Sequence, residues 1–487
     1  MNEEIRKLEP KALWNNFTDL NAIPRPSKKE ERVIAFIKEF GQKLGLETIE
    51  DEAGNVIIKK PATPGMENRK GIIMQSHLDM VHQKNSDTDF DFDTQGIEMY
   101  TDQSWVRAKG TTLGADNGLG VAAIMAVLES TEIQHPQLEA LFTIDEETGM
   151  TGAKGLKGGL LQGEILLNLD TEEDDEIDIG CAGGVDVTAE RTYRETAVPG
   201  NTTGYSFTVK GLNGGHSGME IHKGFGNANK IMNRLLHLAS EKFGLCIAEI
   251  NGGSLRNAIP RESFALTALP EQATDSFLAE MQKQISHIKN EQKATDPSLQ
   301  ILIERAETPA MVMDPDVQKD LLRVIYAAHN GVYRMSADME NLVETSNNIA
   351  RVIVKQGKIH IGCLTRSSAE SSKFDLAHAL RSAFELMGAE VTFSSSYPGW
   401  QPNVQSPILE VLKAIYEKQN GSEPQVVACH AGLECGLLAT YYPDMDMISF
   451  GPTIKGAHSP DERASIPSVQ KFWNFVIEIL KNIPVKG

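Results

Sequence analysis

The sequence is short of cysteine, has no long apolar segment and lacks a basic leader. Its five cysteines are scattered, and no two of them form a Cys-x-x-Cys pair, so a thiolate zinc site has no support. Buried, reduced thiols in a reducing compartment are the simpler interpretation. No apolar run is long enough to span a bilayer, and the first residues lack the features of a secretory signal. We therefore expect a cytoplasmic protein without a membrane partner.

Basic residues are also scarce. The chain has 47 Lys and Arg against 67 Asp and Glu, which gives a formal net charge of -20. This balance argues against nucleic acid as a partner, because the neutralisation of phosphates requires clustered Lys and Arg. Part of the acidic excess could instead be carboxylates that hold cations. The densest acidic run, residues 171–178, is most simply interpreted as a solvated loop.

The length of 487 residues exceeds one ordinary core and predicts two to four domains. In the first part of the chain, strand-like and helix-like segments alternate, which predicts an α/β layered sheet. In such sheets, ligands bind beyond the carboxyl ends of the strands. The expected strands cover 55–59, 71–77, 138–144 and 165–169, and the expected helices cover 30–44 and 119–128.

The pattern changes after about residue 183 and predicts an inserted α+β domain, for which two similar lobes are one option. A turn-rich segment at 397–402 marks the return to the first domain. The predicted boundaries are 1–185 and 398–487 for the two parts of a catalytic domain, and 186–397 for the insertion.

Histidines and carboxylates stand at or just after the ends of the predicted strands. His77 and Asp79 would point the same way on an extended segment, so Asp79 could fix the tautomer of a metal-bound His77. Asp116 lies in a glycine-rich segment where a helix begins. Alone, His-x-Asp is more often a surface hydrogen bond, and Asp116 is more simply a helix N-cap. A carboxylate at position 116 could nevertheless bridge two cations.

Three further positions complete the pattern. Glu146 and Glu147 are adjacent at a strand end, where successive side chains diverge, so one could bind metal while the other acts as a base. An exposed acidic turn is an equal alternative. Asp170 closes an apolar strand, and His458 lies in a loop rich in Gly and Pro. Imidazole and carboxylate together suit zinc, cobalt or manganese, and a metal pair could activate water while polarising a carbonyl.

A specific resemblance covers the chain from LEPKALWNNF to the last predicted helix. The segments that carry it are QSHLDMV, GTTLGADNGLG, DEETGMTG, NLDTEE, GLNGGHSG, RNAIPRE, YPGWQP, HAGLECG and GAHSPDE. They resemble the co-catalytic dinuclear zinc peptidases, and within them the aminoacyl-histidine dipeptidase branch, also called Xaa-His dipeptidases or carnosinase-like enzymes. The resemblance implies an α/β fold with a zinc-peptidase-like three-layer catalytic domain and an inserted α+β lid domain.

The resemblance also implies a set of metal ligands. It implies two Zn²⁺ ions per chain, with Co²⁺ or Mn²⁺ as substitutes. Asp116 would bridge the two ions. His77 and Asp170 would complete one site, and Glu147 and His458 would complete the other.

Further roles follow from the same resemblance. Glu146 would be the general base, and Asp79 would orient the first ligand histidine. From the lid, His216, Asn257 and Arg366 would stabilise the oxyanion or bind the substrate carboxylate, for which an Arg is suited. Their simpler interpretations are a turn glycine cluster, a turn amide and a surface strand arginine.

The implied function is hydrolysis of dipeptides, preferentially Xaa-His including β-alanyl-histidine, by two-metal-activated water with a glutamate base. A related di-zinc amidohydrolase, either a deacylase or a carboxypeptidase, is the nearer alternative. A non-catalytic metal-binding protein is the more distant one. The sequence leaves a homodimer open, and it assigns no role to His430 or Glu434 in the HAGLECG segment.

Overall fold

A computed structural model describes residues 2–487 of the chain. The chain folds into two compact units, and the second is inserted into the first. The first unit comprises the residues up to Cys181, Trp400–Ala428 and Leu433–Gly487, and the second comprises Ala182–Gly399 and Cys429–Gly432. The predicted boundaries at 185 and 397 lie close to these junctions. The short segment Cys429–Gly432 was expected in the catalytic domain.

An eight-stranded sheet forms the centre of the first unit, in the order β1-β2-β6-β3-β7-β21-β8-β20. Its strands are β1 (Glu47–Glu50), β2 (Val56–Lys60), β3 (Ile72–His77), β6 (Leu138–Thr143), β7 (Ile165–Asn168), β8 (Glu176–Cys181), β20 (Gln425–Cys429) and β21 (Asp446–Ser449). Strands β6, β3, β7 and β21 pair in parallel. Their carboxyl ends therefore lie along one edge of the sheet.

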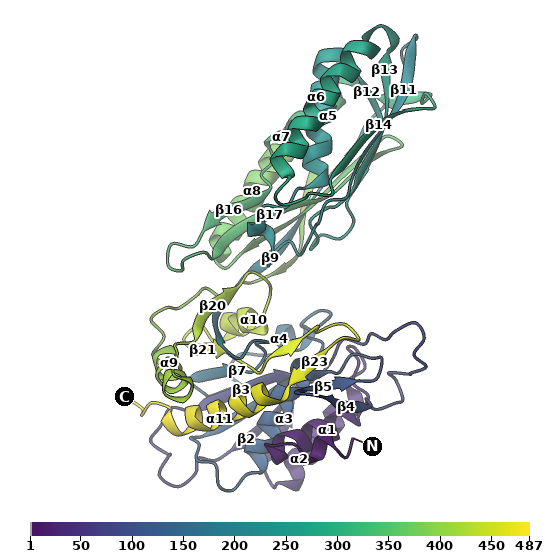
Figure 1. Ribbon diagram of the computed structural model, residues 1–487. Coiled ribbons are helices and arrows are strands. Elements are labelled where there is room, and N and C mark those ends of the chain that lie inside the picture. Colours follow the sequence, from purple (N-terminus) through teal and green to yellow (C-terminus); the bar gives the residue numbers. More distant parts are fainter. Residues whose placement is uncertain (1) are drawn as a thin grey trace. The chain divides into compact units, whose positions relative to one another are not determined.

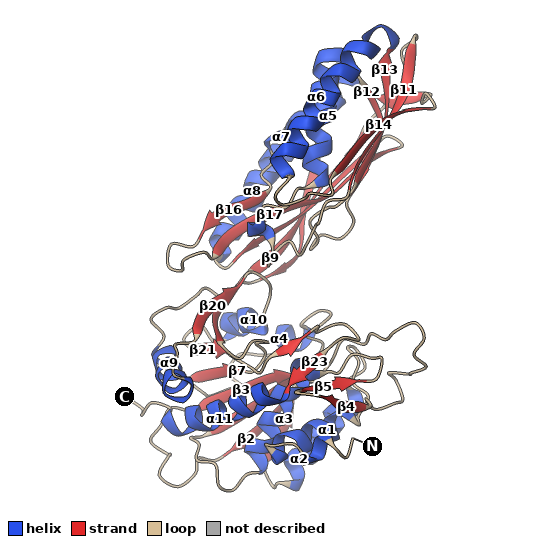
Figure 2. Cartoon of the chain, in the orientation of Figure 1, coloured by secondary structure: helices blue, strands red, loops and turns tan. Residues whose placement is uncertain are grey.

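Helices cover both faces of this sheet (Figure 2). Every residue of β3, β6 and β7 is buried, as expected for strands covered on both sides. α3 packs on β3, and α9 packs on β21. The helices are α1 (Lys11–Asn21), α2 (Glu31–Lys43), α3 (Ala115–Glu129), α4 (Thr151–Gly155), α9 (Pro407–Asn420), α10 (Glu434–Tyr441) and α11 (Ile466–Asn482), with a short 3-10 helix, η1 (Ile5–Lys7).

A small antiparallel sheet lies in the same unit, in the order β22-β23-β5-β4. It consists of β4 (Met99–Asp102), β5 (Trp105–Ala108), β22 (Ile454–Lys455) and β23 (Arg463–Ser465). The acidic run at 171–178 departs from the expected solvated loop. Its last residues begin β8, and Asp178 is buried with 7% of its surface exposed.

The second unit is built on one antiparallel sheet in the order β14-β11-β13-β12-β17-β18-β9-β19, with β16 paired to β17. Helices α5 to α8 lie along one face of it (Figure 1), and their apolar sides form one core with the strands. Any internal repeat of lobes therefore shares a single sheet. Strands β9 and β19 were not predicted from the sequence.

The elements of the second unit have the following bounds. The strands are β9 (Gly183–Thr192), β10 (Glu195–Ala197), β11 (Thr202–Lys210), β12 (Cys246–Gly252), β13 (Ser263–Pro270), β14 (Gln300–Ala306), β15 (Met311–Met313), β16 (Gly331–Met335), β17 (Val343–Lys355), β18 (Lys358–Ser367) and β19 (Glu390–Tyr397). The helices are η2 (Ile221–Lys223), α5 (Ala228–Phe243), η3 (Glu271–Ala273), α6 (Thr274–Gln292), α7 (Pro315–Ala327) and α8 (Glu370–Glu385). Among the described residues, no helix combines the length and apolar character that crossing a bilayer requires.

Candidate metal centre

The five predicted metal ligands all lie in the first unit, at the carboxyl edge of its large sheet or in loops that reach it. His77 ends β3, Asp170 follows β7, and Glu147 follows β6. Asp116 lies in the first turn of α3, and His458 lies in the loop between β22 and β23. Segments far apart in the sequence are thus brought together.

The first group of ligand atoms surrounds His77. Its Nε2 lies 3.2 Å from Asp116 Oδ1 and 3.5 Å from Asp170 Oδ1. The ligand atoms of these three residues lie within 4.8 Å of one another. The His77 side chain is 1% exposed, which leaves its imidazole facing the two carboxylates rather than water.

The second group surrounds His458, whose Nε2 lies 3.1 Å from Asp116 Oδ2 and 3.0 Å from Glu147 Oε2. Asp116 therefore belongs to both groups and offers one oxygen to each. Among the described residues no backbone N–H donates to the Asp116 carboxylate, whose partners are the two imidazoles, so the structure gives the N-cap alternative no support. Asp116 itself has non-helical backbone angles, and its peptide bond to Asn117 is cis.

The electrostatics of the cage favour cations. Burial alone would lower the pKa of His77, but the charge of Asp170 and hydrogen bonds that the imidazole donates to the carboxylates raise it well above its usual value. Hydrogen bonds to Asp116 and Glu147 raise the pKa of His458 to about 11. Glu147 Oε1 is buried and has no hydrogen-bond partner among the described residues. Imidazole nitrogens and carboxylate oxygens at this spacing fit metal ions.

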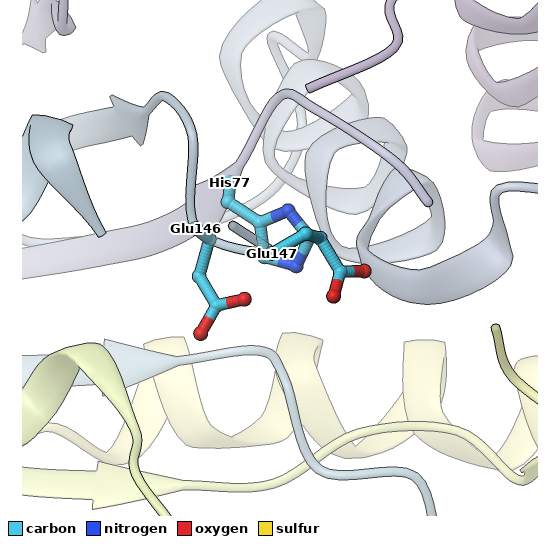
Figure 3. A group of neighbouring side chains, drawn as sticks. All are labelled: His77, Glu146 and Glu147. Atoms are coloured by element: carbon cyan, nitrogen blue, oxygen red, sulfur yellow. The ribbon is translucent and has the colours of Figure 1, made fainter. Parts of the chain in front are cut away.

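Glu146 lies close to His77 and Glu147, and ligand atoms of these three residues lie within 4.8 Å of one another (Figure 3). The two adjacent glutamate side chains extend on different sides of the His77 ring, as the sequence predicted for successive residues. Burial raises the pKa of Glu146 well above its usual value, and the nearby Asp170 and Glu434 add to the effect. A half-buried carboxyl with a raised pKa, close to the predicted metal ligands, is suited to accept and return a proton.

Asp79 joins the first histidine to the loop of the glutamates. Its Oδ1 lies 3.3 Å from His77 Nδ1 and accepts a hydrogen bond of 3.0 Å from the backbone N–H of Glu146. Its Oδ2 accepts hydrogen bonds from Ser27 Oγ at 2.7 Å and from the N–H of Glu147 at 3.3 Å. Asp79 is therefore placed to orient the imidazole and the glutamates together.

Sequence reasoning missed two buried charged residues next to the cage. Glu462 accepts hydrogen bonds from four successive backbone N–H groups that end at Asp116. Arg25 donates to three backbone carbonyls near His77 and Asp116. Hydrogen bonds to backbone leave no pattern in one sequence, although the arginine in NAIPRPS and the glutamate in GAHSPDE both lie in turn-rich segments.

A polar ladder crosses the large sheet just below the ligands. Gln75 Nε2 donates to Glu434 Oε2 at 2.6 Å, and Gln75 Oε1 accepts from Asn168 Nδ2 at 2.5 Å. Ser449 Oγ donates to Asn168 Oδ1 at 2.5 Å. Thr171 continues the ladder to Ser449 and to Asp178, both at 2.8 Å. Glu434, without a role in the sequence analysis, thus ends a buried chain of hydrogen bonds.

The predicted substrate contacts His216, Asn257 and Arg366 lie in the second unit. His216 Nδ1 accepts hydrogen bonds from the N–H groups of Gly218 and Met219, which leaves the proton on Nε2. The pKa of His216 is lowered by burial and by the charge of Arg366. Arg366 is 4% exposed and is the penultimate residue of β18, so it is not the surface strand arginine of the simpler interpretation.

His430 lies in the same neighbourhood of the second unit. Its Nε2 forms a hydrogen bond of 2.8 Å with Ser346 Oγ, and its Nδ1 is buried without a partner among the described residues. Burial, Arg366 and His216 lower the pKa of His430 to about 3. The charge of Arg366 thus lies close to two neutral imidazoles, and its Nη1 donates a hydrogen bond of 2.8 Å to the hydroxyl of Tyr397.

Comparisons with known proteins agree with this arrangement. The model of Peptidase family M20/M25/M40 matches residues 73–482. The cytosol non-specific dipeptidase of Escherichia coli is 43% identical over 99% of this chain and 100% of its own length. The crystal structure of aminoacylhistidine dipeptidase from Vibrio alginolyticus has a TM-score of 0.95 and 45% identity, and covers 100% of this chain and 99% of its own.

More distant structures share the fold. A tripeptidase from Staphylococcus aureus has a TM-score of 0.57 at 17% identity and covers 98% of this chain and 99% of its own. The match of the family model over most of the chain, and the relatives above 40% identity, agree with the cage of histidines and carboxylates. The chain belongs to Peptidase family M20/M25/M40, a family of metal-dependent peptidases.

Proposed function

We propose that this protein is a cytoplasmic metallo-dipeptidase that hydrolyses short peptides with a free carboxyl end. The observation that carries the proposal is the carboxylate of Asp116, which is shared between two histidine-containing groups, with Glu146 close to His77 and Glu147. A protein that only binds metal has no need for this additional glutamate. The names of the two relatives above 40% identity, both dipeptidases, support the same reading.

We propose that the cage holds two Zn²⁺ ions, for which Co²⁺ or Mn²⁺ could substitute. His77, Asp116 and Asp170 would hold one ion, and Asp116, Glu147 and His458 the other. Bound ions would make a water molecule more acidic and polarise the scissile carbonyl.

Glu146 would act on the proton of the attacking water. Its carboxylate would accept that proton and then return it to the leaving amine, which a raised pKa favours. Asp79 would keep the His77 imidazole in the tautomer that leaves Nε2 free, because its carboxylate lies against Nδ1.

The second unit would supply the grip on the substrate. We propose that Arg366 binds the C-terminal carboxylate, for which a planar guanidinium is suited. His216, with its proton on Nε2, would donate to the developing oxyanion, and Asn257 would donate from its amide. A substrate with both ends recognised would be short, which favours dipeptides over longer peptides.

A preference for Xaa-His substrates, including β-alanyl-histidine, is the finer proposal. It is supported by the name of the Vibrio relative and by the segments quoted above. A deacylase or carboxypeptidase on the same scaffold is less favoured, because both relatives above 40% identity are named as dipeptidases.

A panel of substrates tests the proposal. Purified protein is assayed on Ala-His, β-alanyl-histidine, an N-acetyl amino acid and a tripeptide, before and after treatment with a chelator. We expect the two dipeptides to be cleaved, and the activity to disappear on chelation and return with Zn²⁺. Turnover of the acetylated substrate without cleavage of free dipeptides would contradict the dipeptidase function, and activity that survives chelation would contradict the metal requirement.

A further inference from the structure

Glu462 organises the backbone that carries the shared carboxylate. Its side chain is buried, with 2% of the residue exposed. Oε2 accepts hydrogen bonds from the N–H groups of Leu113 at 2.7 Å and Gly114 at 3.0 Å. Oε1 accepts from Ala115 at 2.7 Å and Asp116 at 3.3 Å. One carboxylate thus satisfies four successive amides at the start of α3, where backbone N–H groups otherwise lack partners.

Glu462 also belongs to the loop of the other ligand histidine. It precedes β23 in the segment that contains His458, and its own N–H donates to Ser459 O at 3.0 Å. A displacement of Glu462 would therefore move the Asp116 segment and the His458 loop together.

Arg25 contacts the segment before Asp116 through the backbone carbonyl of Gly114. Nη2 donates to Gly114 O at 2.6 Å and to Asn21 Oδ1 at 3.0 Å. Nη1 donates to Leu78 O at 3.0 Å and Asp79 O at 3.1 Å, in the turn that follows His77. The residue is 1% exposed, and no carboxylate forms an ion pair with it among the described residues.

Two glycines leave room for this guanidinium. A Cβ atom at Gly114 would lie 2.6 Å from Arg25 Nη2, and a Cβ atom at Gly118 would lie at the same distance of 2.6 Å. Gly114 also has a φ of 69°, a conformation that side chains disfavour. The glycines of the GADNG segment therefore serve the contact with Arg25 as well as the turn.

We propose that Arg25 and Glu462 are positioning residues for the bridging carboxylate. Glu462 holds the N–H groups and Arg25 holds the carbonyl of the segment that ends at Asp116, and the pair connects this segment to the loops of His77 and His458. The segments of three of the five proposed ligands are thus held by two buried side chains that are not themselves in the ligand groups. This inference rests on the proposed two-metal function.

The proposal differs from a merely structural role in what it expects at the metal sites. If Glu462 only capped α3, its removal would lower stability and leave both sites intact. If it only supported His458, one site would weaken. Since Asp116 belongs to both groups, its displacement weakens both sites together.

Titration with Co²⁺ tests this expectation, because the absorption bands of the bound ion report its coordination geometry. The first variant is Glu462→Gln, whose amide nitrogen cannot accept hydrogen bonds from two of the four N–H groups. The second is Arg25→Lys, whose single ammonium group cannot replace both Nη1 and Nη2 of the guanidinium. We expect the dissociation constants of both Co²⁺ sites to rise together by roughly 10- to 100-fold, with altered spectra. Tryptophan fluorescence checks that each variant is folded.

Glu139→Gln is the matched control. Glu139 is a buried glutamate, 1% exposed, that accepts backbone N–H groups of Gln162 and Gly163 near the opposite end of β6. The Glu139→Gln variant should have a lower free energy of unfolding than wild type, and both of its Co²⁺ sites should be unchanged. If Glu462→Gln or Arg25→Lys is folded and binds Co²⁺ at both sites with wild-type affinity and spectrum, the positioning role is wrong. The proposed two-metal function would not be affected by that result. Wild-type protein that binds fewer than two Co²⁺ ions would overturn the proposed function, and the inference with it.

Discussion

At the scale of single residues, identical side chains take different roles because their surroundings differ. Glu146 and Glu147 are neighbours in the same loop, yet only Glu147 lies at 3.0 Å from the His458 imidazole. Burial raises the pKa of both carboxyls. For Glu147, the hydrogen bond from His458 opposes this rise and lowers the pKa. This difference supports the proposal that Glu146 handles the proton and Glu147 holds the metal.

Replacement of Glu146 by Gln separates these two roles. The amide keeps the shape of the side chain and cannot accept a proton from water. We expect metal content equal to that of wild type, and a turnover reduced by roughly 10²- to 10⁴-fold. Metal analysis and kcat on Ala-His provide the measurements. The paired variant Glu147→Gln should lose metal instead, and a Glu146→Gln enzyme of near wild-type kcat would remove the base from this position.

Asp178 makes the free energy of unfolding depend on pH, and its contribution can be measured separately. Burial raises its pKa from an ordinary value of 3.8 to about 7. The folded chain therefore keeps this proton to about pH 7, whereas the unfolded chain releases it near pH 3.8. The resulting stabilisation is complete below pH 3.8 and is lost as the pH rises through about 7. Between about pH 5 and about pH 8, wild type should lose roughly 3 kcal/mol relative to Asp178→Asn.

Urea unfolding followed by tryptophan fluorescence measures this difference. All four tryptophans, Trp14, Trp105, Trp400 and Trp473, lie in the first unit, so the signal reports the unit that contains Asp178. A chelator in every sample removes the pH dependence of metal binding. The substitution changes the hydrogen bond from Thr171 at both pH values alike. If the difference in unfolding free energy between wild type and Asp178→Asn does not change with pH, Asp178 is already ionised in the folded chain at the lower pH.

At the scale of elements, the sheet keeps its strand ends in register by side chains as well as by backbone. The register pairs Gln75 with Asn168, Asn168 with Ser449, and Ser449 with Asp178. These are the positions of the polar ladder, and they lie on the strands that deliver His77 and Asp170. The ladder is buried, so each of its groups depends on its neighbour for a hydrogen bond.

Asn168→Ala breaks the ladder at its centre. Gln75 Oε1 and Ser449 Oγ each lose a partner in a buried environment. We expect the free energy of unfolding of the first unit to fall by roughly 2–5 kcal/mol. Urea unfolding with tryptophan fluorescence again provides the measurement. Asn474→Ala, at an exposed position of α11, should change it by no more than about 0.5 kcal/mol. Equal effects of the two variants would contradict the ladder.

The elements that carry ligands were predictable because their strands are continuous apolar runs. The expected strands at 71–77, 138–144 and 165–169 differ by one residue or so from β3, β6 and β7. Three of the proposed ligands, His77, Glu147 and Asp170, stand at or after such a run, so their place at the carboxyl edge could be predicted without a structure. Arg25 and Glu462 could not be found in this way, because their partners are backbone groups of distant segments. The polar ladder was missed because Gln75 and Asn168 look like ordinary ends of apolar strands.

At the scale of the whole molecule, the chain divides its chemistry between the two units. The five proposed metal ligands, Glu146 and Asp79 belong to the first unit, and the proposed substrate contacts His216, Asn257 and Arg366 belong to the second. The insertion was visible in the sequence as a change of pattern near residue 183. The return of Cys429–Gly432 to the second unit was not, because four residues carry no pattern of their own.

This division predicts that metal stabilises one unit and not the other. A ligand that binds only the folded state adds RT ln(1 + [L]/Kd), which is about 2.7 kcal/mol for each ion at a hundredfold excess over its Kd. Removal of metal by EDTA should therefore lower the urea midpoint of the tryptophan signal. Hydrogen exchange in the paired strands β17 and β18 of the second unit should not change. Readdition of Zn²⁺ should restore the midpoint. Equal loss of protection in both units would mean that they unfold as one body, and an unchanged tryptophan midpoint would mean that the cage of the first unit holds no metal.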